Sequence, residues 1–490
     1  MASPPNRPAT TTLTWLAAVA IGGGLLATRG AGLEDLDSAN FALALGRYDL
    51  AHHMPHFPGY PVYVAATRVA HAAGADTVLS LQLPGILTWA ACLPLLHRAI
   101  RAWFGPAVAT ITLLLLALSP LPWLTAGRAG SDAMGFALLC ASGASMALGA
   151  HPDEAHAGRL RAIGGLLAGL TLGVRLSYAP AILGLLALSL LRGASWRAHL
   201  GWLAGGVALW AVPFTAITHA ELIAHAQTFL TGHFLVWGGT AWVEGAEAAG
   251  LSGRAMLWAT NLWTHALGLP TEGASTTRWL LLPLLLAGSL SAARSLTPRH
   301  WVNLSVALVP YLLWLWLGQN PDKPRHLLPL LPTLALATAI GLARLPRPAQ
   351  ALPISLLAIT LPLAIVHAQV PSPAAQLANW LNGNARPDQV QIFTGQSERV
   401  VYASFPAFRV EYAPDMAEVH RRLAHWPTPP PVLMWTDDIP DWEESPRGYG
   451  PPRPVTAFLR DPAVNPHRAS LGLWTADRVE EIAIHTEERP

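Results

Sequence analysis

The chain has 490 residues, of which 52% are hydrophobic and only 12% are charged, and its mean hydropathy is +0.35. This composition is too apolar for a water-soluble globular protein and predicts a polytopic α-helical membrane protein. The net charge of +2 is small. The basic residues are scattered between apolar segments, which excludes the continuous basic face that nucleic-acid binding requires.

Apolar segments long enough to cross a bilayer core, about 20 residues, recur along the chain. They predict about eleven transmembrane helices, the first of them retained because no cleavable signal peptide is evident. Residues 64–74 are too short to cross and are expected to form an interfacial helix. The expected spans are residues 10–28, 79–97, 105–124, 133–150, 162–175, 177–191, 200–218, 279–293, 301–317, 327–343 and 350–367.

Arginines recur in every second loop between these spans. Lys and Arg are retained on the cytoplasmic side of short loops, so this pattern predicts a cytoplasmic N-terminus and an extracytoplasmic C-terminus. The same assignment gathers four polar segments on the outer face of the membrane. They are residues 34–63, 128–132, 219–278 and 319–326.

After about residue 370 the composition changes from membrane-like to water-soluble. Strand-like runs at 390–395, 399–405, 431–436, 454–460 and 469–475 surround one clear helix at 416–426. This alternation predicts a small α/β domain. We therefore expect a transmembrane domain over residues 1–369 and an extracytoplasmic α/β domain over 370–490. The latter carries no phosphate loop or nucleophile elbow, which favours an accessory or acceptor-binding role.

The two cysteines do not indicate a disulfide framework or a zinc site. Cys92 and Cys140 both fall inside apolar segments, and neither has a Cys or His at metal-ligand spacing.

Three acids open the first outer segment. Asp37 begins a stretch in which apolar and aromatic residues follow at helical spacing, so its carboxylate can cap a helix or act catalytically. The two roles are compatible. Glu34 and Asp35 lie nearer the end of the first span and have no predicted helix to orient them. Asp37 is therefore the favoured functional acid.

Prolines then recur at every third position, at Pro55, Pro58 and Pro61. Because polyproline II has three residues per turn, this spacing predicts a stiff extended strand that forms the wall of a cavity, with His56 and Tyr60 beside it. The histidines of this segment can in principle bind a metal. The prolines disfavour the helix that would align them, so loop histidines without a metal are the favoured interpretation.

A second acid, Asp132, opens the expected fourth span, four residues after Arg128. As with Asp37, helix capping is an alternative to function at such a boundary. The predicted topology favours function, because it places Asp132 on the same side of the membrane as Asp37.

A basic loop completes the expected outer face. Lys323 is the only lysine of the chain and lies beside Arg325 and His326. These residues can anchor lipid headgroups, or they can recognise a bound phosphate, for which Arg offers a bidentate fork and Lys a point charge. Arg175, at the outer end of its helix, either joins them or extends toward water.

Four motifs carry a resemblance to a known family: residues 37–41 (DSANF), 56–61 (HFPGYP), 127–132 (GRAGSD) and 324–329 (PRHLLP). Together they resemble the GT-C superfamily of polytopic glycosyltransferases. The likeness is to the bacterial branch related to protein O-mannosyltransferases and the lipid A aminoarabinose transferase, and it extends over residues 10–345. Two departures are Ser38, where related members often have Glu, and His326, where the family usually has Tyr.

The resemblance implies an enzyme of the bacterial inner membrane that transfers a sugar from a polyprenyl-phosphate donor to a lipid, glycan or protein acceptor. Transfer would invert the anomeric centre and occur at the outer membrane boundary. Asp37 would be the catalytic acidic residue of the first outer loop, and Asp132 the second. A divalent cation held by these two acids is the one cofactor that the resemblance allows.

This chemistry needs one base, because the leaving phosphate is already a good anion. It also needs positive groups to meet the charge that grows on that phosphate. We predict Asp37 as the base, Asp132 as its orienting partner, and a set of substrate-binding residues that comprises His56, Tyr60, Arg128, Arg175, Lys323, Arg325 and His326.

The main alternative is a transporter or flippase of lipid-linked sugars. No inverted repeat is detectable, and the acids gather at a membrane boundary instead of the bilayer midplane. Both features favour the glycosyltransferase.

Overall fold

Clustering of the contacts divides the chain into two compact units. Unit 1 comprises Met1–Ala31 and Leu43–Gln369, and unit 2 comprises Gly32–Ala42 and Val370–Pro490. The short segment Gly32–Ala42, which the sequence assigned to the membrane domain, thus groups with the C-terminal part of the chain. The computed structural model describes residues 7–191, 196–243, 250–266, 290–291, 294, 297–426, 432–446, 448–465 and 469–478.

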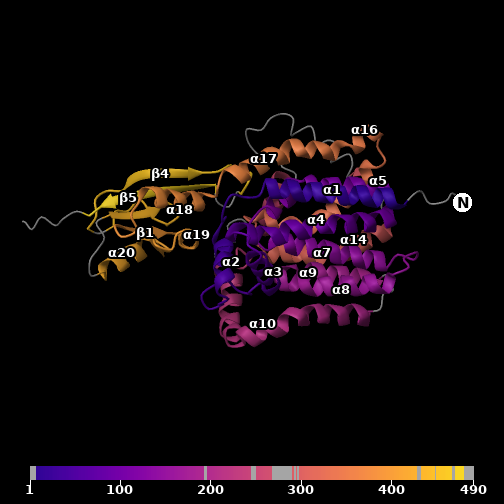
Figure 1. Ribbon diagram of the computed structural model, residues 1–490, viewed down its shortest axis with the longest axis horizontal. Coiled ribbons are helices and arrows are strands. Elements are labelled where there is room, and N and C mark those ends of the chain that lie inside the picture. Colours follow the sequence, from indigo (N-terminus) through magenta and orange to yellow (C-terminus); the bar gives the residue numbers. More distant parts are fainter. Residues whose placement is uncertain are drawn as a thin grey trace, which may run out of the picture. The chain divides into compact units, whose positions relative to one another are not determined.

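Unit 1 is a bundle of helices, several of which run alongside one another (Figure 1). Helix α2 (Leu36–Gly46) begins in unit 2 and ends in unit 1. The described helices of unit 1 are α1 (Arg7–Ala27), α3 (Pro61–Ala72), α4 (Thr77–Phe104), α5 (Pro106–Leu118), α6 (Pro120–Ala126), α7 (Asp132–Gly149), α8 (Ala157–Val174), η1 (Leu176–Tyr178), α9 (Ala179–Leu191), α10 (Trp196–Gly232), η2 (His233–Trp237), α11 (Gly250–Asn261), η4 (Leu262–Ala266), α14 (Pro298–Gly318), η5 (Pro324–Leu330), α15 (Leu331–Leu342), α16 (Arg347–Gln350), η6 (Leu352–Leu356) and α17 (Leu357–Gln369).

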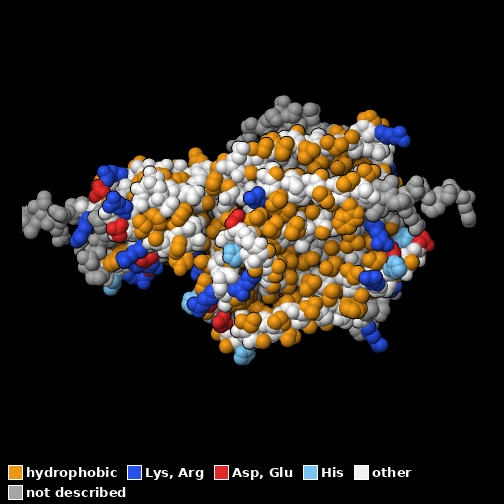
Figure 2. All heavy atoms as spheres, viewed as in Figure 1, with side chains coloured by type: hydrophobic (Ala, Val, Ile, Leu, Met, Phe, Trp, Pro, Cys, Tyr) orange, Lys and Arg blue, Asp and Glu red, His pale blue; other side chains and the backbone are white. Residues whose placement is uncertain are grey.

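The bundle belongs to an integral membrane protein. Among the described residues, six helices are long and apolar enough to cross a membrane, or seven if the bent pair α5 and α6 is one span. Two further apolar helices, Thr12–Ala27 and Leu176–Leu191, are shorter, and the expected span 279–293 lies largely outside the described residues. Figure 2 shows hydrophobic side chains covering the long helices, with charged side chains toward the helix ends.

Local signals set the ends of these helices. Asp76 caps α4 by accepting a hydrogen bond from the Leu79 N–H at 2.8 Å. Gly105, with a φ of 86°, separates α4 from α5, and Pro106 opens the latter, where its missing N–H costs nothing. Helix α10 continues past residue 218, so the expected span and the start of the expected outer loop form one helix.

The proline-rich segment between α2 and α3 does not form the expected extended strand. Asp49 and Met54 exchange two backbone hydrogen bonds, of 2.6 and 2.7 Å, which fold the chain into a turn. The peptide bonds before Pro55 and Pro58 are cis, and Pro61 is the first residue of α3. The polyproline prediction was wrong because the three-residue spacing of prolines carries no information about the hydrogen bonds that close the turn.

Unit 2 contains the expected small α/β domain. Its five strands are ordered β2-β1-β3-β5-β4, with β1 parallel to β2 and β3, and with β5 antiparallel to β3 and β4. Apolar clusters from the strands and helices form its core. The elements are α18 (Pro373–Asn384), β1 (Val390–Thr394), α19 (Glu398–Ser404), β2 (Arg409–Tyr412), α20 (Met416–Ala424), β3 (Val432–Thr436), β4 (Arg453–Leu459) and β5 (Ser470–Asp477).

One predicted strand is a helix. The apolar run at 399–405 lies within α19, which connects the parallel strands β1 and β2. Parallel neighbours need a crossover connection, usually a helix, and this requirement overrides the β propensity of a run that contains Val400 and Val401. Both valines are fully buried.

Candidate functional site

The buried carboxylate of Asp132 faces two arginines of unit 1. Its Oδ1 lies 3.0 Å from Nη2 of Arg175, and its Oδ2 lies 3.8 Å from Nε of Arg325. The side chains of Asp132 and Arg175 are each 9% exposed, and that of Arg325 is 17% exposed. We call these three residues the Asp132 cluster. Sequence reasoning named all three but did not predict that they contact one another.

Hydrogen bonds from Gln82 fix the turn that places Asp132 at the start of α7. The buried Gln82 of α4 donates hydrogen bonds to the carbonyls of Gly30 and Gly127, at 2.8 and 2.9 Å, and so fixes the turn that precedes α7. Ser131, not Asp132, occupies the N-cap position. The carboxylate of Asp132 is instead used in the ion pair with Arg175, so the capping alternative is not what the structure shows.

Arg175 follows the last residue of α8, where the backbone becomes extended. Its Nη1 donates to Oγ of Ser131 at 3.2 Å, and its guanidinium carbon lies 6.0 Å from the ring centre of Tyr178. A snorkelling arginine would keep its charge in water, whereas this residue is 8% exposed. Within the described part of the chain, Arg175 Nε and the Tyr178 hydroxyl are buried without a hydrogen-bond partner.

Two predicted binding residues of the first outer segment approach this cluster. Tyr60 lies within electrostatic reach of Arg175. Its hydroxyl is 3.0 Å from Nε2 of His56, and the two rings are 4.8 Å apart. Tyr60 precedes Pro61 with a φ of 47°, a left-handed conformation that turns the chain into α3. His56 and Tyr60 thus belong to the same region of unit 1 as Arg175.

The predicted basic loop leads into the 3₁₀ helix η5. Arg325 reaches Asp132, and Lys323 lies within electrostatic reach of His233. His326 is 7% exposed and contacts Trp258 edge to face at 6.5 Å. The loop therefore places one positively charged side chain, that of Arg325, beside Asp132.

Arg128 is next to a histidine that the sequence did not single out. His265, in η4, lies within electrostatic reach of Arg128. Burial, together with this positive neighbour, lowers the pKa of His265 to about 4. His265 is consequently uncharged near neutral pH and adds no positive charge beside Arg128.

Sequence reasoning also missed the residues that hold the basic loop. Arg254, Trp258 and Asn261 follow one another at helical spacing on α11, and all three face the segment 316–326. The Asn261 amide donates to the Pro321 carbonyl at 2.5 Å. The Arg254 guanidinium donates, at 2.7 to 3.1 Å, to the carbonyls of Gly239, Trp316 and Gln319. The helical spacing of these residues was visible in the sequence, but the segment that they contact was not.

The residues around Asp132 do not fit a divalent cation. The described residues contain no group of three or more His, Cys, Asp or Glu side chains placed to hold a metal ion. Asp132 already faces the guanidinium groups of Arg175 and Arg325, which would repel a further cation. The geometry suits a carboxylate that positions two arginines. It does not suit a carboxylate that binds a metal ion.

Asp37, in unit 2, lies in the first turn of α2 but does not cap it. Asp35 does, because its Oδ1 accepts the Ser38 N–H at 3.0 Å and its carbonyl accepts the Ala39 N–H at 3.1 Å. The expectation that Asp35 has no helix to orient it was wrong. The helix begins one residue before Asp37, so the cap is two residues earlier in the chain.

A scan of protein-family models finds no match to this chain, and neither does a sequence search of curated proteins. A search of solved structures does find similar chains. ArnT from Cupriavidus metallidurans bound to undecaprenyl phosphate is 15% identical with a TM-score of 0.48, over 96% of this chain and 98% of that one. The Archaeoglobus fulgidus oligosaccharyltransferase is 13% identical with a TM-score of 0.47, over 87% and 70%.

The mycobacterial arabinofuranosyltransferase AftD is 14% identical with a TM-score of 0.41, over 98% of this chain and 40% of that one. The printed names of these neighbours include an oligosaccharyltransferase and an arabinofuranosyltransferase. At these identities and TM-scores the likeness carries no activity, substrate or partner over to this chain.

Proposed function

We propose that this protein is a glycosyltransferase that takes its sugar from a polyprenyl phosphate at the outer boundary of the membrane. The observation that carries the proposal is the Asp132 cluster, in which one carboxylate faces two buried or nearly buried guanidinium groups. Two positive charges and one negative charge leave these three groups with a positive excess. Guanidinium groups attract phosphate, and Arg175 and Arg325 place two of them beside one carboxylate.

The chemistry of the cluster favours a phosphate over other anions. Arginine presents a planar fork that matches phosphate oxygens, and Arg175 retains a buried Nε with no partner among the described residues. Lys323, in the same loop as Arg325, adds a point charge. As the bond between the sugar and the phosphate breaks, negative charge grows on the phosphate oxygens, and these cations stabilise it.

The proton of the acceptor hydroxyl needs a base, and we assign this role to Asp37. The acceptor oxygen forms a bond to the anomeric carbon, the bond to the phosphate oxygen breaks, and the proton passes to the carboxylate of Asp37. Attack opposite the leaving phosphate inverts the anomeric centre. Asp35, not Asp37, caps α2. The carboxylate of Asp37 is therefore not needed for capping, which supports the assignment. Asp132 serves as the positioning partner of Arg175 and Arg325.

The proposed setting is the inner membrane of a bacterium, with about eleven spans, a cytoplasmic N-terminus and the C-terminal α/β domain outside. The acceptor is a lipid, a glycan or a protein. The steps described are written without a metal ion, because Asp132 faces two guanidinium groups.

Binding of a short-chain polyprenyl phosphate to the purified protein tests the role of the cluster. Arg325→Ala should weaken binding by about 10- to 100-fold, because a hydrogen bond to a charged group contributes roughly 1.5–3 kcal/mol. Arg347→Ala, which removes an exposed arginine of α16, is the matched control and should bind normally. Equal affinities for the two variants would overturn the proposed phosphate site.

Transfer itself is measured with a polyprenyl-phosphate sugar and the Asp37→Asn variant. Loss of transfer in a variant that still binds the donor would support Asp37 as the base. Full transfer activity would overturn it. In reconstituted vesicles, movement of the lipid-linked sugar across the bilayer without any transfer would instead favour the transporter.

A further inference from the structure

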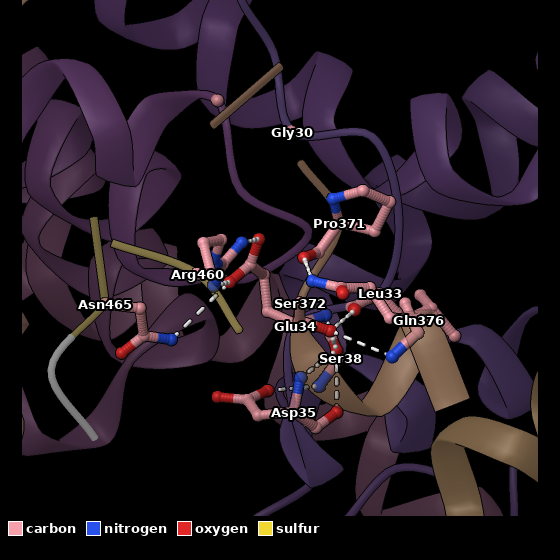
Figure 3. A network of polar contacts seen from close by, with 12 residues as sticks. Gly30, Leu33, Glu34, Asp35, Ser38, Pro371, Ser372, Gln376, Arg460 and Asn465 are labelled. Atoms are coloured by element: carbon pink, nitrogen blue, oxygen red, sulfur yellow. Dashed lines mark hydrogen bonds and ion pairs between the residues drawn. The ribbon is translucent and has the colours of Figure 1, made fainter. Parts of the chain in front are cut away.

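A buried ion pair in unit 2 joins the start of α2 to the C-terminal α/β domain (Figure 3). Arg460 follows β4 and lies 426 residues from Glu34 in the sequence. Its Nη1 and Nη2 donate to Oε1 and Oε2 of Glu34 at 2.8 and 2.5 Å. The two side chains are only 1% and 5% exposed, and the amide of Asn465 adds a contact of 3.4 Å to Oε2. The Glu34 carboxylate is thus held at both oxygens.

Two further hydrogen bonds tie the same segment to residues beyond 370. The hydroxyl of Ser372 donates to the carbonyl of Leu33 at 2.7 Å, a contact drawn in Figure 3. On the other side of Asp37, Nη1 of Arg399 donates to Oδ1 of Asn40 at 3.0 Å. The C-terminal domain therefore holds the chain both before and after Asp37.

Between these anchors the backbone is itself constrained. The hydroxyl of Ser38 accepts the N–H groups of Glu34 and Asp35, each at 2.9 Å, and donates to the Asp35 carbonyl at 2.6 Å. Together with the Asp35 cap, these bonds leave little freedom to the turn that carries Asp37. This network also gives a use to Ser38, one of the two positions where the chain departs from the related family.

The pair is better explained by orientation than by stability. Replacing a buried ion pair with apolar side chains of similar size is often neutral or stabilising, so burial of Glu34 and Arg460 brings little net stability. A two-point contact between a guanidinium and a carboxylate does fix direction, which apolar packing does less well. Reaction rates are sensitive to such placement, since an error of about 1 Å can cost about 100-fold.

We propose that Arg460, acting through Glu34, is a positioning residue for Asp37, so that the C-terminal domain orients the proposed base and is more than an accessory module. This inference rests on the proposed function, in which Asp37 is the base. Glu34, which sequence reasoning set aside for want of a helix to orient it, then becomes the residue through which the domain acts.

The test measures kcat, donor binding and thermal stability in the full-length protein. Arg460→Lys and Glu34→Gln each remove the two-point contact and should lower kcat by about 10- to 100-fold, with binding of a short-chain polyprenyl phosphate unchanged. Arg453→Lys is the matched control, because it alters an exposed ion pair with Asp477 in the same domain. It should leave kcat as in the wild type.

A double variant separates orientation from folding. Glu34→Leu combined with Arg460→Met replaces the pair by apolar side chains and should recover thermal stability but not kcat. Recovery of kcat together with stability would reduce the pair to a structural role and overturn the inference.

Asp37→Asn distinguishes failure of the inference from failure of the proposed base. In an Asp37→Asn background, Arg460→Lys should cause no further loss, because both changes act through the same carboxylate. If Asp37→Asn is inactive while Arg460→Lys and Glu34→Gln keep full kcat, the inference is wrong and the base stands. If Asp37→Asn itself is fully active, the base is wrong and the inference falls with it.

Discussion

Two buried carboxylates of this protein are paired with arginine in different ways. Both oxygens of Glu34 accept hydrogen bonds from Arg460, and the amide of Asn465 adds a longer contact. Asp132 has two arginines, each of which approaches a single oxygen, at 3.0 and 3.8 Å. The first arrangement is electrically balanced and geometrically complete. The second has a positive excess among its three groups and is less tightly bonded.

The difference separates a contact that positions the backbone from a site that binds a ligand. In a medium of low dielectric constant, an unbalanced charge costs far more than in water, so a balanced pair has no need of a further partner. A cluster with excess positive charge gains free energy when an anion binds. We therefore interpret the Glu34–Arg460 pair as a device that fixes the backbone and the Asp132 cluster as a device that receives a phosphate.

The largest effect is expected when the carboxylate of the cluster is removed. Asp132→Asn leaves Arg175 buried without its ion pair and should lower stability by about 3–5 kcal/mol. Because an anion can then take the place of the carboxylate, inorganic phosphate should restore more stability to Asp132→Asn than to Glu34→Gln. Thermal unfolding with and without phosphate measures this. Equal restoration in the two variants would erase the distinction between the clusters.

A smaller effect is expected from loosening the loop that delivers Arg325. Arg254→Ala removes two hydrogen bonds to carbonyls of the segment 316–326, with a third to Gly239, and should destabilise that segment by roughly 1–3 kcal/mol. Amide hydrogen exchange should rise in that segment, and affinity for a polyprenyl phosphate should fall. Asn261→Ala, which removes one such bond, should have a weaker effect in the same direction.

Unaltered exchange in Arg254→Ala would show that α11 does not hold the loop. Exchange that rises throughout the chain would indicate general destabilisation instead. Either result would remove α11 from the description of the phosphate site.

The smallest effect concerns a partly buried acid, Glu398, whose ion-pair contact with Arg399 Nε is long at 4.0 Å. Burial raises the pKa of Glu398 above its usual range, and Asp438 adds to the shift. The folded state thus favours the protonated form, and the resulting stability is complete below the pKa of the unfolded chain, about 4.3. It is lost as the pH rises through the raised value.

Glu398→Gln should accordingly raise stability at pH 7 by up to ~1 kcal/mol, and the gain should vanish near pH 4. Thermal unfolding at the two pH values provides the measurement. A loss of stability at pH 7 would mean that the charged carboxylate is favourable in the fold, as it is at Glu34.

Much of the architecture could be predicted from local sequence. The apolar segments gave a helical membrane domain, and alternating strand-like runs gave an α/β domain, four of whose strands were located correctly. The errors arose where the local structure depends on residues that are distant in the sequence. The run at 399–405 is helical because it connects two parallel strands. The proline segment at 55–61 is not an extended strand because backbone hydrogen bonds between Asp49 and Met54 fold the chain into a turn.

The candidate site shows the same division. Asp132 was selected from the sequence because the predicted topology places it on the same side of the membrane as Asp37. Arg175 and Arg325 were selected because arginine can recognise a bound phosphate. Arg254 was overlooked, because nothing near it in the chain reveals the carbonyls that it binds, which lie 15 to 65 residues away.

By itself, the sequence determined which segments are apolar and which charged side chains stand at the ends of the expected spans. These properties depend on residues a few positions apart, so they can be predicted from short stretches of the sequence. Only the tertiary structure decided which acid meets which arginine, and in what number. Ion pairing depends on distance in the folded chain and on burial, and the 426 residues between Glu34 and Arg460 place that decision beyond any local pattern.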